Sequence, residues 1–293
     1  MKLNLDYYKG TDLYSDGEVE DELLHITKNN KSFHHILKEN SSWPILYHLS
    51  PIRANLLEWY PFQETASVLE IGAGCGAITG LLSEKVNKVT AIELSKKRAE
   101  ILASRYEDRE NIEVFVGNFE DIHFDRKFDY ITLIGVLEYT GTYGDGPSPY
   151  LDFLKKAKSM LNPQGSLIIA IENKYGLKYW AGAKEDHTGN LFDSIENYVG
   201  NDDVRTFSKI EIEELLNKAG FSKNDFYYPM PDYKLPSQVF SDSYLPKPGD
   251  LKITPNFDRD RLLLFNEKIT FDNIIQNEAF PFFSNSFLIF SKE

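Results

Sequence analysis

Three glycines at alternate positions stand in the most informative stretch of the sequence, Val68–Thr79. An apolar run precedes Gly72, Gly74 and Gly76, and apolar residues at helical spacing follow them, which predicts a strand, a glycine-rich turn and a helix. Glycine lets a backbone approach a ligand closely and adopt positive φ angles. The turn therefore predicts a cofactor site, and a tight turn that binds nothing is the alternative interpretation.

Two classes of cofactor fit this turn. Gly72, Gly74 and Ala77 satisfy the dinucleotide pattern of NAD and FAD enzymes. Glu70, however, stands two residues before the first glycine, where a carboxylate would repel a pyrophosphate but attract an ammonium group. The sequence thus favours a zwitterionic, sulfonium-bearing cofactor, and a NAD-dependent dehydrogenase is the weaker alternative.

The pattern E-x-G-x-G-x-G resembles the first motif of class I S-adenosylmethionine-dependent methyltransferases. Glu93 ends a predicted strand about 20 residues beyond the turn, the separation at which a carboxylate meets ribose hydroxyls; an exposed strand-end acid is the alternative. Asn118 occupies a position that is usually acidic in the family and contacts the adenine amine. Phe119 could cover the adenine or pack in the core.

The resemblance implies S-adenosylmethionine as the cofactor. Arg53 is a candidate partner for its carboxylate, with a surface ion pair as the alternative, and the resemblance adds Tyr47. The predicted cofactor-binding residues are Glu70, Gly72, Gly74, Gly76, Glu93, Leu94, Asn118, Phe119, Gly135, Arg53 and Tyr47.

Strands and helices alternate from residue 61 onward, which predicts an α/β fold with a parallel sheet and right-handed crossovers. The resemblance implies a Rossmann-like, seven-stranded sheet whose last strand runs antiparallel between the fifth and sixth. The predicted strands are 68–71, 88–93, 112–116, 128–134, 166–171, 221–228 and 286–290. Residues 1–60 are predicted to form a helical cap outside the sheet, and 61–293 the cofactor-binding core.

Two insertions, at about 172–205 and 229–257, are predicted as lids over the site, and an irregular structural insertion is the alternative for the first. Three runs, E-N-K-Y-G-L-K-Y-W-A-G-A-K-E-D-H-T-G at 172–189, R-T-F-S at 205–208 and Y-P-M-P-D-Y-K-L-P at 228–236, are similar to methyltransferase domains found beside glycosyltransferases in bacterial surface-polysaccharide proteins. This likeness implies a hydroxyl of a sugar or glycan precursor as the methyl acceptor, and glycosyltransferases as partners. N- or O-methylation of another small metabolite and a non-catalytic scaffold that binds the cofactor are the alternatives.

An alcohol must lose its proton as it attacks the methyl group, and a neutral imidazole suits that task near pH 7. His187, in the first insertion, is the candidate general base. Glu138, after the fourth core strand, could orient the imidazole or serve as the base itself. A hydrogen bond from His187 to the insertion's backbone is the alternative. No metal site is predicted, and metal assistance is left open.

Composition restricts the remaining classes. A formal charge of −13 over 293 residues, a pI near 5.0 and the lack of a long basic tract argue against nucleic-acid partners. The single cysteine, Cys75, cannot form an internal disulfide framework and is interpreted as a small loop residue. No apolar run long enough for a membrane span and no signal pattern occur, which predicts a cytoplasmic protein with no membrane partner.

Overall fold

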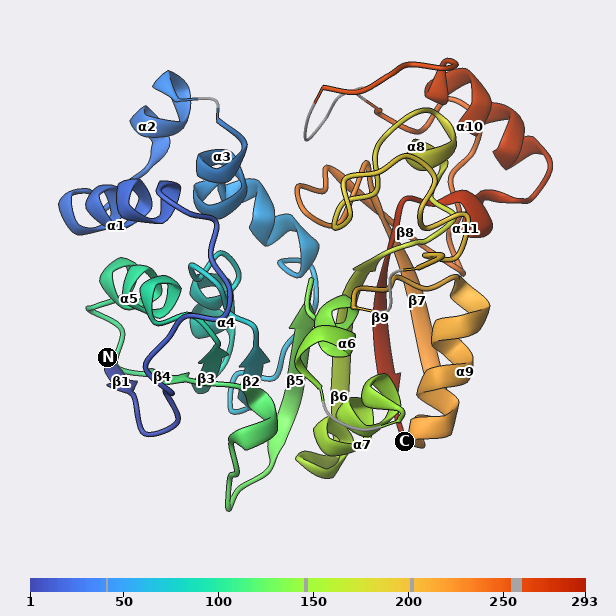
Figure 1. Ribbon diagram of the computed structural model, residues 1–293. Helices are drawn as coiled ribbons and strands as arrows, with labels where there is room; N and C mark the ends of the chain where they lie inside the picture. The colour runs from blue at the N-terminus through green and yellow to red at the C-terminus, as the bar shows by residue number, and fades with distance from the viewer. Residues whose placement is uncertain (41, 145–146, 201–202, 254–259) are drawn as a thin grey trace. The chain divides into compact units, whose positions relative to one another are not determined.

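The computed structural model of the chain describes residues 1–40, 42–144, 147–200, 203–253 and 260–293 (Figure 1). The chain divides into two compact units. Unit 1 comprises Met1–Leu133 and Met160–Gly165, and unit 2 comprises Ile134–Ser159 and Ser166–Glu293. Each unit is described by itself.

Unit 1 contains parallel strands in the order β1, β4, β3, β2, β5. Their bounds are β1 (Lys2–Asn4), β2 (Ser67–Ile71), β3 (Lys88–Glu93), β4 (Ile112–Val116) and β5 (Phe128–Ile134), the last residue of which belongs to unit 2. All residues of β2 and β3 after the first are buried, as in strands covered on both faces. Glu70 pairs in register with Ala91, and Glu93 with Val116, so the carboxyl ends share one edge.

The helices of unit 1 include an N-terminal group that packs on the glycine turn. Leu23 of α1 and Leu49 of α3 belong to one apolar cluster with Cys75 of the turn and Ile101 of α5. The bounds are α1 (Val19–Asn29), α2 (His34–Glu39), α3 (Trp43–Leu49), the 3₁₀ helix η1 (Pro51–Leu56), α4 (Thr79–Lys85), α5 (Lys96–Arg105) and the 3₁₀ helix η2 (Phe119–Asp121). The N-terminal segment is therefore fixed to the turn by buried apolar contacts.

Unit 2 has strands in the order β6, β9, β7, β8, with β9 antiparallel to both β6 and β7 (Figure 1). The strands are β6 (Leu161–Glu172, in this unit from Ser166), β7 (Lys223–Met230), β8 (Gln238–Ser241) and β9 (Ser286–Lys292). Its helices are η3 (Leu137–Tyr139), α6 (Thr140–Tyr143), α7 (Pro149–Ser159), α8 (Leu177–Trp180), α9 (Lys209–Ala219), α10 (Glu267–Gln276) and α11 (Phe280–Phe283).

Most predicted elements are confirmed. The strands predicted at 88–93, 112–116 and 128–134 have those bounds in the structure, and the last strand is antiparallel between the fifth and sixth. Ser208 caps α9 with a full capping box, and Gly220 ends it in the left-handed conformation. Ser50 caps η1, which is a 3₁₀ helix.

The sequence prediction was wrong on the number of strands, because β1 and β8 add to the predicted seven. β1 lies in the segment predicted as a wholly helical cap, and its three residues are too few to show a strand periodicity. β6 begins five residues earlier than predicted, at Leu161. Residues 254–259 lie outside the described part of the chain, and α10 begins after them at Glu267.

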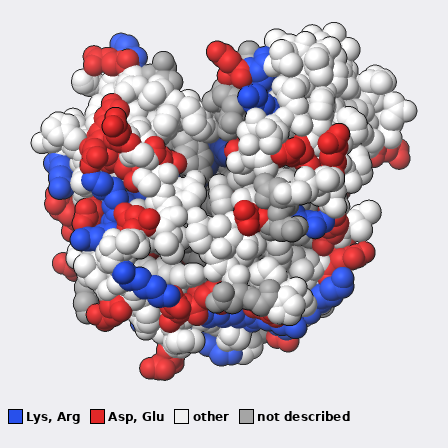
Figure 2. Space-filling view, viewed as in Figure 1, with Lys and Arg blue, Asp and Glu red and all other residues white. Residues whose placement is uncertain are grey.

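Acidic and basic side chains lie beside one another over the described part of the face in Figure 2. Among the described residues, no helix has both the length and the apolar character that a membrane crossing requires.

Candidate functional site

The glycine turn of unit 1 is held to β3 by hydrogen bonds. The amides of Gly72 and Ala73 donate to the carbonyl of Ile92 at 2.9 and 3.0 Å. The amide of Gly74 donates to the carboxylate of Glu93 at 2.7 Å. Gly72 and Gly74 have φ angles of +73° and +54°, in the left-handed region that glycine adopts without a steric penalty. The fold of the turn thus requires these glycines.

The second and third glycines have different surroundings. A Cβ atom built on Gly76 would come within 2.9 Å of the side chains of Leu102 and Tyr106 of the α5 region. A Cβ atom on Gly74 would have no other atom of the described chain within 4 Å. Gly76 therefore permits close packing of the turn on α5, whereas Gly74 leaves open space above the backbone.

Glu70 lies buried at the end of β2, only 4% exposed. Burial raises its pKa to about 8, against the hydrogen bond that Thr79 donates to it at 2.6 Å, and the nearby carboxylate of Glu93 raises it further. The charge of Arg53 lowers the pKa. A cation bound against Glu70 would favour its charged form.

Arg53 and Tyr47, both predicted as cofactor residues, contact each other. The guanidinium carbon of Arg53 lies 4.4 Å from the centroid of the Tyr47 ring, and Arg53 is buried. Because Arg53 acts on the pKa of Glu70, the N-terminal cap places a positive charge near the end of β2. Their cofactor contacts stay predictions.

Glu93 is buried and divides its carboxylate oxygens between two backbone donors. One oxygen accepts from Gly74, and the other accepts from Ser95 at 2.9 Å. Burial raises its pKa, while Arg98 and these amides lower it. Leu94, next in the chain, is half-buried. Glu93 therefore positions the glycine turn, in addition to its predicted contact with ribose.

Asn118 and Phe119 follow β4 as predicted. The Asn118 side chain accepts a hydrogen bond from the amide of Glu120 at 3.0 Å and so caps η2. Phe119 is 4% exposed, which agrees with the alternative prediction that it packs in the core. Neither observation tests contact with adenine.

Sequence analysis missed two residues that hold the turn. Arg105 donates to the carbonyl of Cys75 at 2.7 Å, and the hydroxyl of Tyr106 donates to the carbonyl of Gly76 at 2.8 Å. No sequence signal marks them, because each partner is 30 residues away. Burial raises the pKa of the Cys75 thiol to about 12, in agreement with its interpretation as a loop residue.

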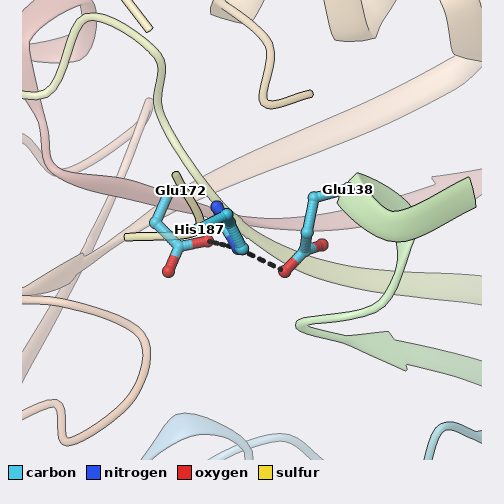
Figure 3. A group of neighbouring side chains, drawn as sticks. All are labelled: Glu138, Glu172 and His187. Carbon is cyan, nitrogen blue, oxygen red and sulfur yellow. Dashed lines mark ion pairs between the residues drawn. The ribbon is translucent and has the colours of Figure 1, made fainter. Parts of the chain in front are cut away.

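In unit 2, His187 lies between two glutamates from different elements (Figure 3). Its Nε2 atom is 3.5 Å from Oε1 of Glu138, in η3, and 4.0 Å from Oε2 of Glu172, at the end of β6. Both glutamates are 0% exposed. The structure thus brings together the two predicted catalytic residues, His187 and Glu138, and adds Glu172.

The second ring nitrogen of His187 contacts Glu185. Nδ1 of His187 is 2.9 Å from Oε1 of Glu185. Glu185 also accepts hydrogen bonds from the amides of His187 and Thr188, both at 2.7 Å, and from the hydroxyl of Tyr198 at 3.1 Å. The ring of Tyr139 meets His187 edge to face at 5.2 Å. The orientation of the imidazole is therefore fixed from several sides.

Ion pairs extend this group into what we call the buried charge network. Lys178 is 2.8 Å from both Asp186 and Asp232, and Lys234 pairs with Asp186 and, at 2.6 Å, with Glu172. Within the described chain, the network comprises Glu138, Glu172, Lys178, Glu185, Asp186, His187, Asp232 and Lys234. The insertion predicted at 172–205 thus supplies some of the most buried residues of the unit.

Gly135, predicted to contact the cofactor, has a φ angle of +71°. A Cβ atom there would lie 2.7 Å from the hydroxyl of Tyr233. Packing against Tyr233 therefore accounts for this glycine, and its cofactor role stays a prediction.

Comparison with known proteins identifies the family. Residues 69–169 match the family model described as a methyltransferase domain. The chain is also 30% identical over 158 residues to an uncharacterized methyltransferase of Staphylococcus carnosus, and the match covers 53% of this chain and 70% of the relative. The chain belongs to the methyltransferase family.

Two further similarities span more of this methyltransferase. It is 26% identical over 221 residues to the ribosomal RNA small subunit methyltransferase A of Mycoplasma mycoides, covering 72% of this chain and 74% of the relative. Phosphoethanolamine N-methyltransferase 1 of Haemonchus contortus, solved with phosphoethanolamine and S-adenosylhomocysteine, shares its fold at a TM-score of 0.51. That match has 14% identity and covers 93% of this chain and 48% of the other.

The fold is therefore the Rossmann-like class I methyltransferase fold, and S-adenosylmethionine is the cofactor, as predicted. The residues of unit 1 fit this group on two observations. Gly74 leaves open space above the turn, and an ammonium group bound against the buried Glu70 carboxyl would offset the burial that raises its pKa.

The arrangement of His187 favours a charged imidazole. Burial alone would lower its pKa, but hydrogen bonding with Glu138 and Glu185 and the charge of Glu172 raise the pKa well above the ordinary value. An imidazolium has no free nitrogen to accept a proton. In that charged form His187 could not accept a proton, and the catalytic roles of His187 and Glu138 stay predictions.

Proposed function

We propose that this methyltransferase transfers the methyl group of S-adenosylmethionine to a hydroxyl of a sugar or glycan precursor. The observation that carries the proposal is the pair of buried carboxylates, Glu138, four residues after β5, and Glu172, the last residue of β6. Ligands of open α/β sheets bind beyond the carboxyl ends of the strands. An ionised carboxylate accepts hydrogen bonds and donates none, so it suits the hydroxyl groups of a polyol, which can donate to it.

The bound cofactor supplies an electrophilic methyl group. On this proposal Glu70 and Arg53 bind its ammonium and carboxylate groups, Glu93 accepts from the ribose hydroxyls, and Asn118 meets the adenine. The glycine turn keeps side chains out of the cofactor's space. These roles agree with the burial, charge and chain positions of the residues in unit 1.

Glu138 is proposed to take the proton of the attacking hydroxyl. Neither of its carboxylate oxygens makes a hydrogen bond of ordinary length among the described residues, although both are buried. An acceptor hydroxyl would satisfy one of them. His187 then acts as a positioning residue, because its Nε2 atom lies 3.5 Å from Oε1 of Glu138 while Glu185 holds its Nδ1 atom at 2.9 Å.

Aromatic side chains of unit 2 support a saccharide acceptor. Tyr175 and Phe282 stack at 5.1 Å between ring centroids, and Phe282 is 47% exposed. Trp180 of α8 is 39% exposed. The apolar C–H face of a sugar ring packs favourably on such rings, and polar groups nearby set its orientation. A glycosyltransferase that makes the acceptor is the partner that this proposal implies.

Incubation with methyl-labelled S-adenosylmethionine tests the proposal. Nucleotide sugars, oligosaccharides, small amines and ribosomal RNA serve as parallel acceptors, and NMR of the product identifies the methylated atom. We expect an O-methyl saccharide. Methylation of nitrogen or of RNA would overturn the acceptor, and cofactor binding without transfer to any acceptor would favour the scaffold alternative.

A further inference from the structure

We propose that Glu138, Glu172 and His187 bind one divalent transition-metal ion, such as Mn²⁺. Each residue offers one ligand atom, and the three atoms lie within 4.8 Å of one another. Ligands at about 2.1 Å from a metal are about 3.0 Å apart at adjacent octahedral positions and about 3.4 Å apart in a tetrahedron, so side-chain movements of about 1–2 Å would complete the site. The observed separations from Nε2 of His187, 3.5 and 4.0 Å, are already close to these values.

A second observation is independent of these distances. The four carboxylate oxygens of Glu138 and Glu172 are buried, and none makes a hydrogen bond of ordinary geometry among the described residues. Lys234 reaches Glu172 through an ion pair with Oε1, which leaves Oε2 facing His187 (Figure 3). Oε2 of Glu138 has neither a hydrogen bond nor an ion pair within the described chain, and such buried polar atoms are rare because their desolvation is costly. A cation between them would remove that cost.

Glu185 supplies the outer contact that metal-binding histidines usually have. It lies at hydrogen-bonding distance from Nδ1 of His187, so that nitrogen keeps its proton when a metal ion displaces the proton of Nε2. The lone pair freed on Nε2 then faces the two glutamates. Two backbone amides and Tyr198 fix Glu185 in turn. A carboxylate that orients an imidazole in this way is characteristic of metal centres.

The charge of the network also favours a cation. Among the described residues, five carboxylates face two lysines and His187. These groups carry three excess negative charges when His187 is neutral and two when it is an imidazolium. Uncompensated buried charge is strongly unfavourable, and a divalent ion would neutralise most of it.

The ligand set selects the class of metal. One imidazole with two carboxylates suits Mn²⁺, Fe²⁺, Co²⁺ or Zn²⁺, whereas Mg²⁺ and Ca²⁺ prefer oxygen ligands alone. Three protein ligands leave a coordination position open, as in catalytic rather than structural sites. If the proposed function holds, an acceptor hydroxyl takes that position, and the remaining oxygen of Glu138 accepts its proton.

Metal binding is testable without cofactor or acceptor. The full chain, freed of metal by a chelator, is titrated with Mn²⁺, and electron paramagnetic resonance measures the free ion. We expect one Mn²⁺ per chain, and visible absorption bands when Co²⁺ replaces it. Glu172→Gln and Glu138→Gln should each weaken binding more than tenfold, and Glu185→Gln about 10- to 100-fold.

The control is His48→Gln, because His48 is equally buried and pairs with Asp16 in unit 1. It should bind Mn²⁺ like the wild type. Circular dichroism checks that each variant is folded. The Co²⁺ spectrum of the wild type tests the site even if a variant does not fold. No binding of Mn²⁺, Co²⁺ or Zn²⁺ by the folded wild type, or wild-type affinity in both folded glutamate variants, would overturn the site. Either result leaves the proposed methyl transfer standing, since that is measured by its labelled product.

Discussion

The glycine turn of unit 1 and the buried charge network of unit 2 hold their polar groups by different means. In the turn, backbone amides and carbonyls make most of the contacts, and the glycines come from five consecutive residues. In the network, charged side chains make the contacts, and these residues are spread along the chain from position 138 to position 234.

This difference affects how each region responds to change. Neutral backbone hydrogen bonds depend on chain conformation, so the turn should be sensitive to Cβ atoms and φ angles. Buried ion pairs depend on charge balance, so the network should be sensitive to the loss of any one charge. The following predictions test this contrast, beginning with the largest expected effect.

Glu138→Gln should lower turnover by roughly 10² to 10⁴-fold, because an amide cannot take the acceptor's proton. The affinity for S-adenosylmethionine, measured by calorimetry, should stay within about twofold, since the side chains proposed to bind it, those of Arg53, Glu70, Glu93 and Asn118, lie in unit 1. Glu214→Gln, on the exposed face of α9, is the control and should retain full turnover. Near-normal turnover in folded Glu138→Gln would exclude it as the base.

Lys178→Met should reduce the free energy of unfolding by about 3–5 kcal/mol, because it leaves Asp186 and Asp232 buried without their shared cation. Urea denaturation followed by circular dichroism measures the loss. Lys218→Met is the control, since its partner Glu214 is 3.8 Å away and both side chains are about two-thirds exposed. Equal, small losses of unfolding free energy in both variants would show that charge balance in the network does not contribute to stability.

Gly74→Ala and Gly76→Ala form a matched pair, because both φ angles are positive and both variants carry the same backbone strain, about 1–2 kcal/mol. Gly76→Ala should lose about 1–3 kcal/mol more in urea unfolding, through contact with Leu102 and Tyr106. Gly74→Ala should instead lose more affinity for S-adenosylhomocysteine in calorimetry. The reverse order of stability would contradict the packing of Gly76 against Leu102 and Tyr106. Unchanged cofactor affinity in Gly74→Ala would show that the cofactor does not bind beside this glycine.

The pH dependence of stability should report Glu70. Its pKa is about 8 in the folded chain and near 4.5 when unfolded, so between these values only the folded state binds the proton. Stability of the cofactor-free protein should therefore fall with rising pH in this window, by about 1.4 kcal/mol per pH unit from this group. Glu70→Gln should show a smaller fall between pH 6 and pH 7 in urea unfolding. An identical fall would show that Glu70 is already ionised.

The sequence by itself determined the cofactor class and most of the sheet. Alternating apolar strands and helices, the glycine spacing and the acids at Glu70 and Glu93 are local signals, because strand periodicity and turn conformation are set by neighbouring residues. Capping residues such as Ser208 were readable for the same reason.

Only the tertiary structure decided what surrounds those residues. The partners of His187 are 2, 15 and 49 residues away in the chain, and no local pattern encodes which carboxylates will meet. The short edge strands β1 and β8 depend on pairing with neighbours rather than on their own periodicity. The same holds for protonation: an isolated histidine suits the role of a base near neutral pH, but three buried carboxylates around His187 raise its pKa and favour a cation there.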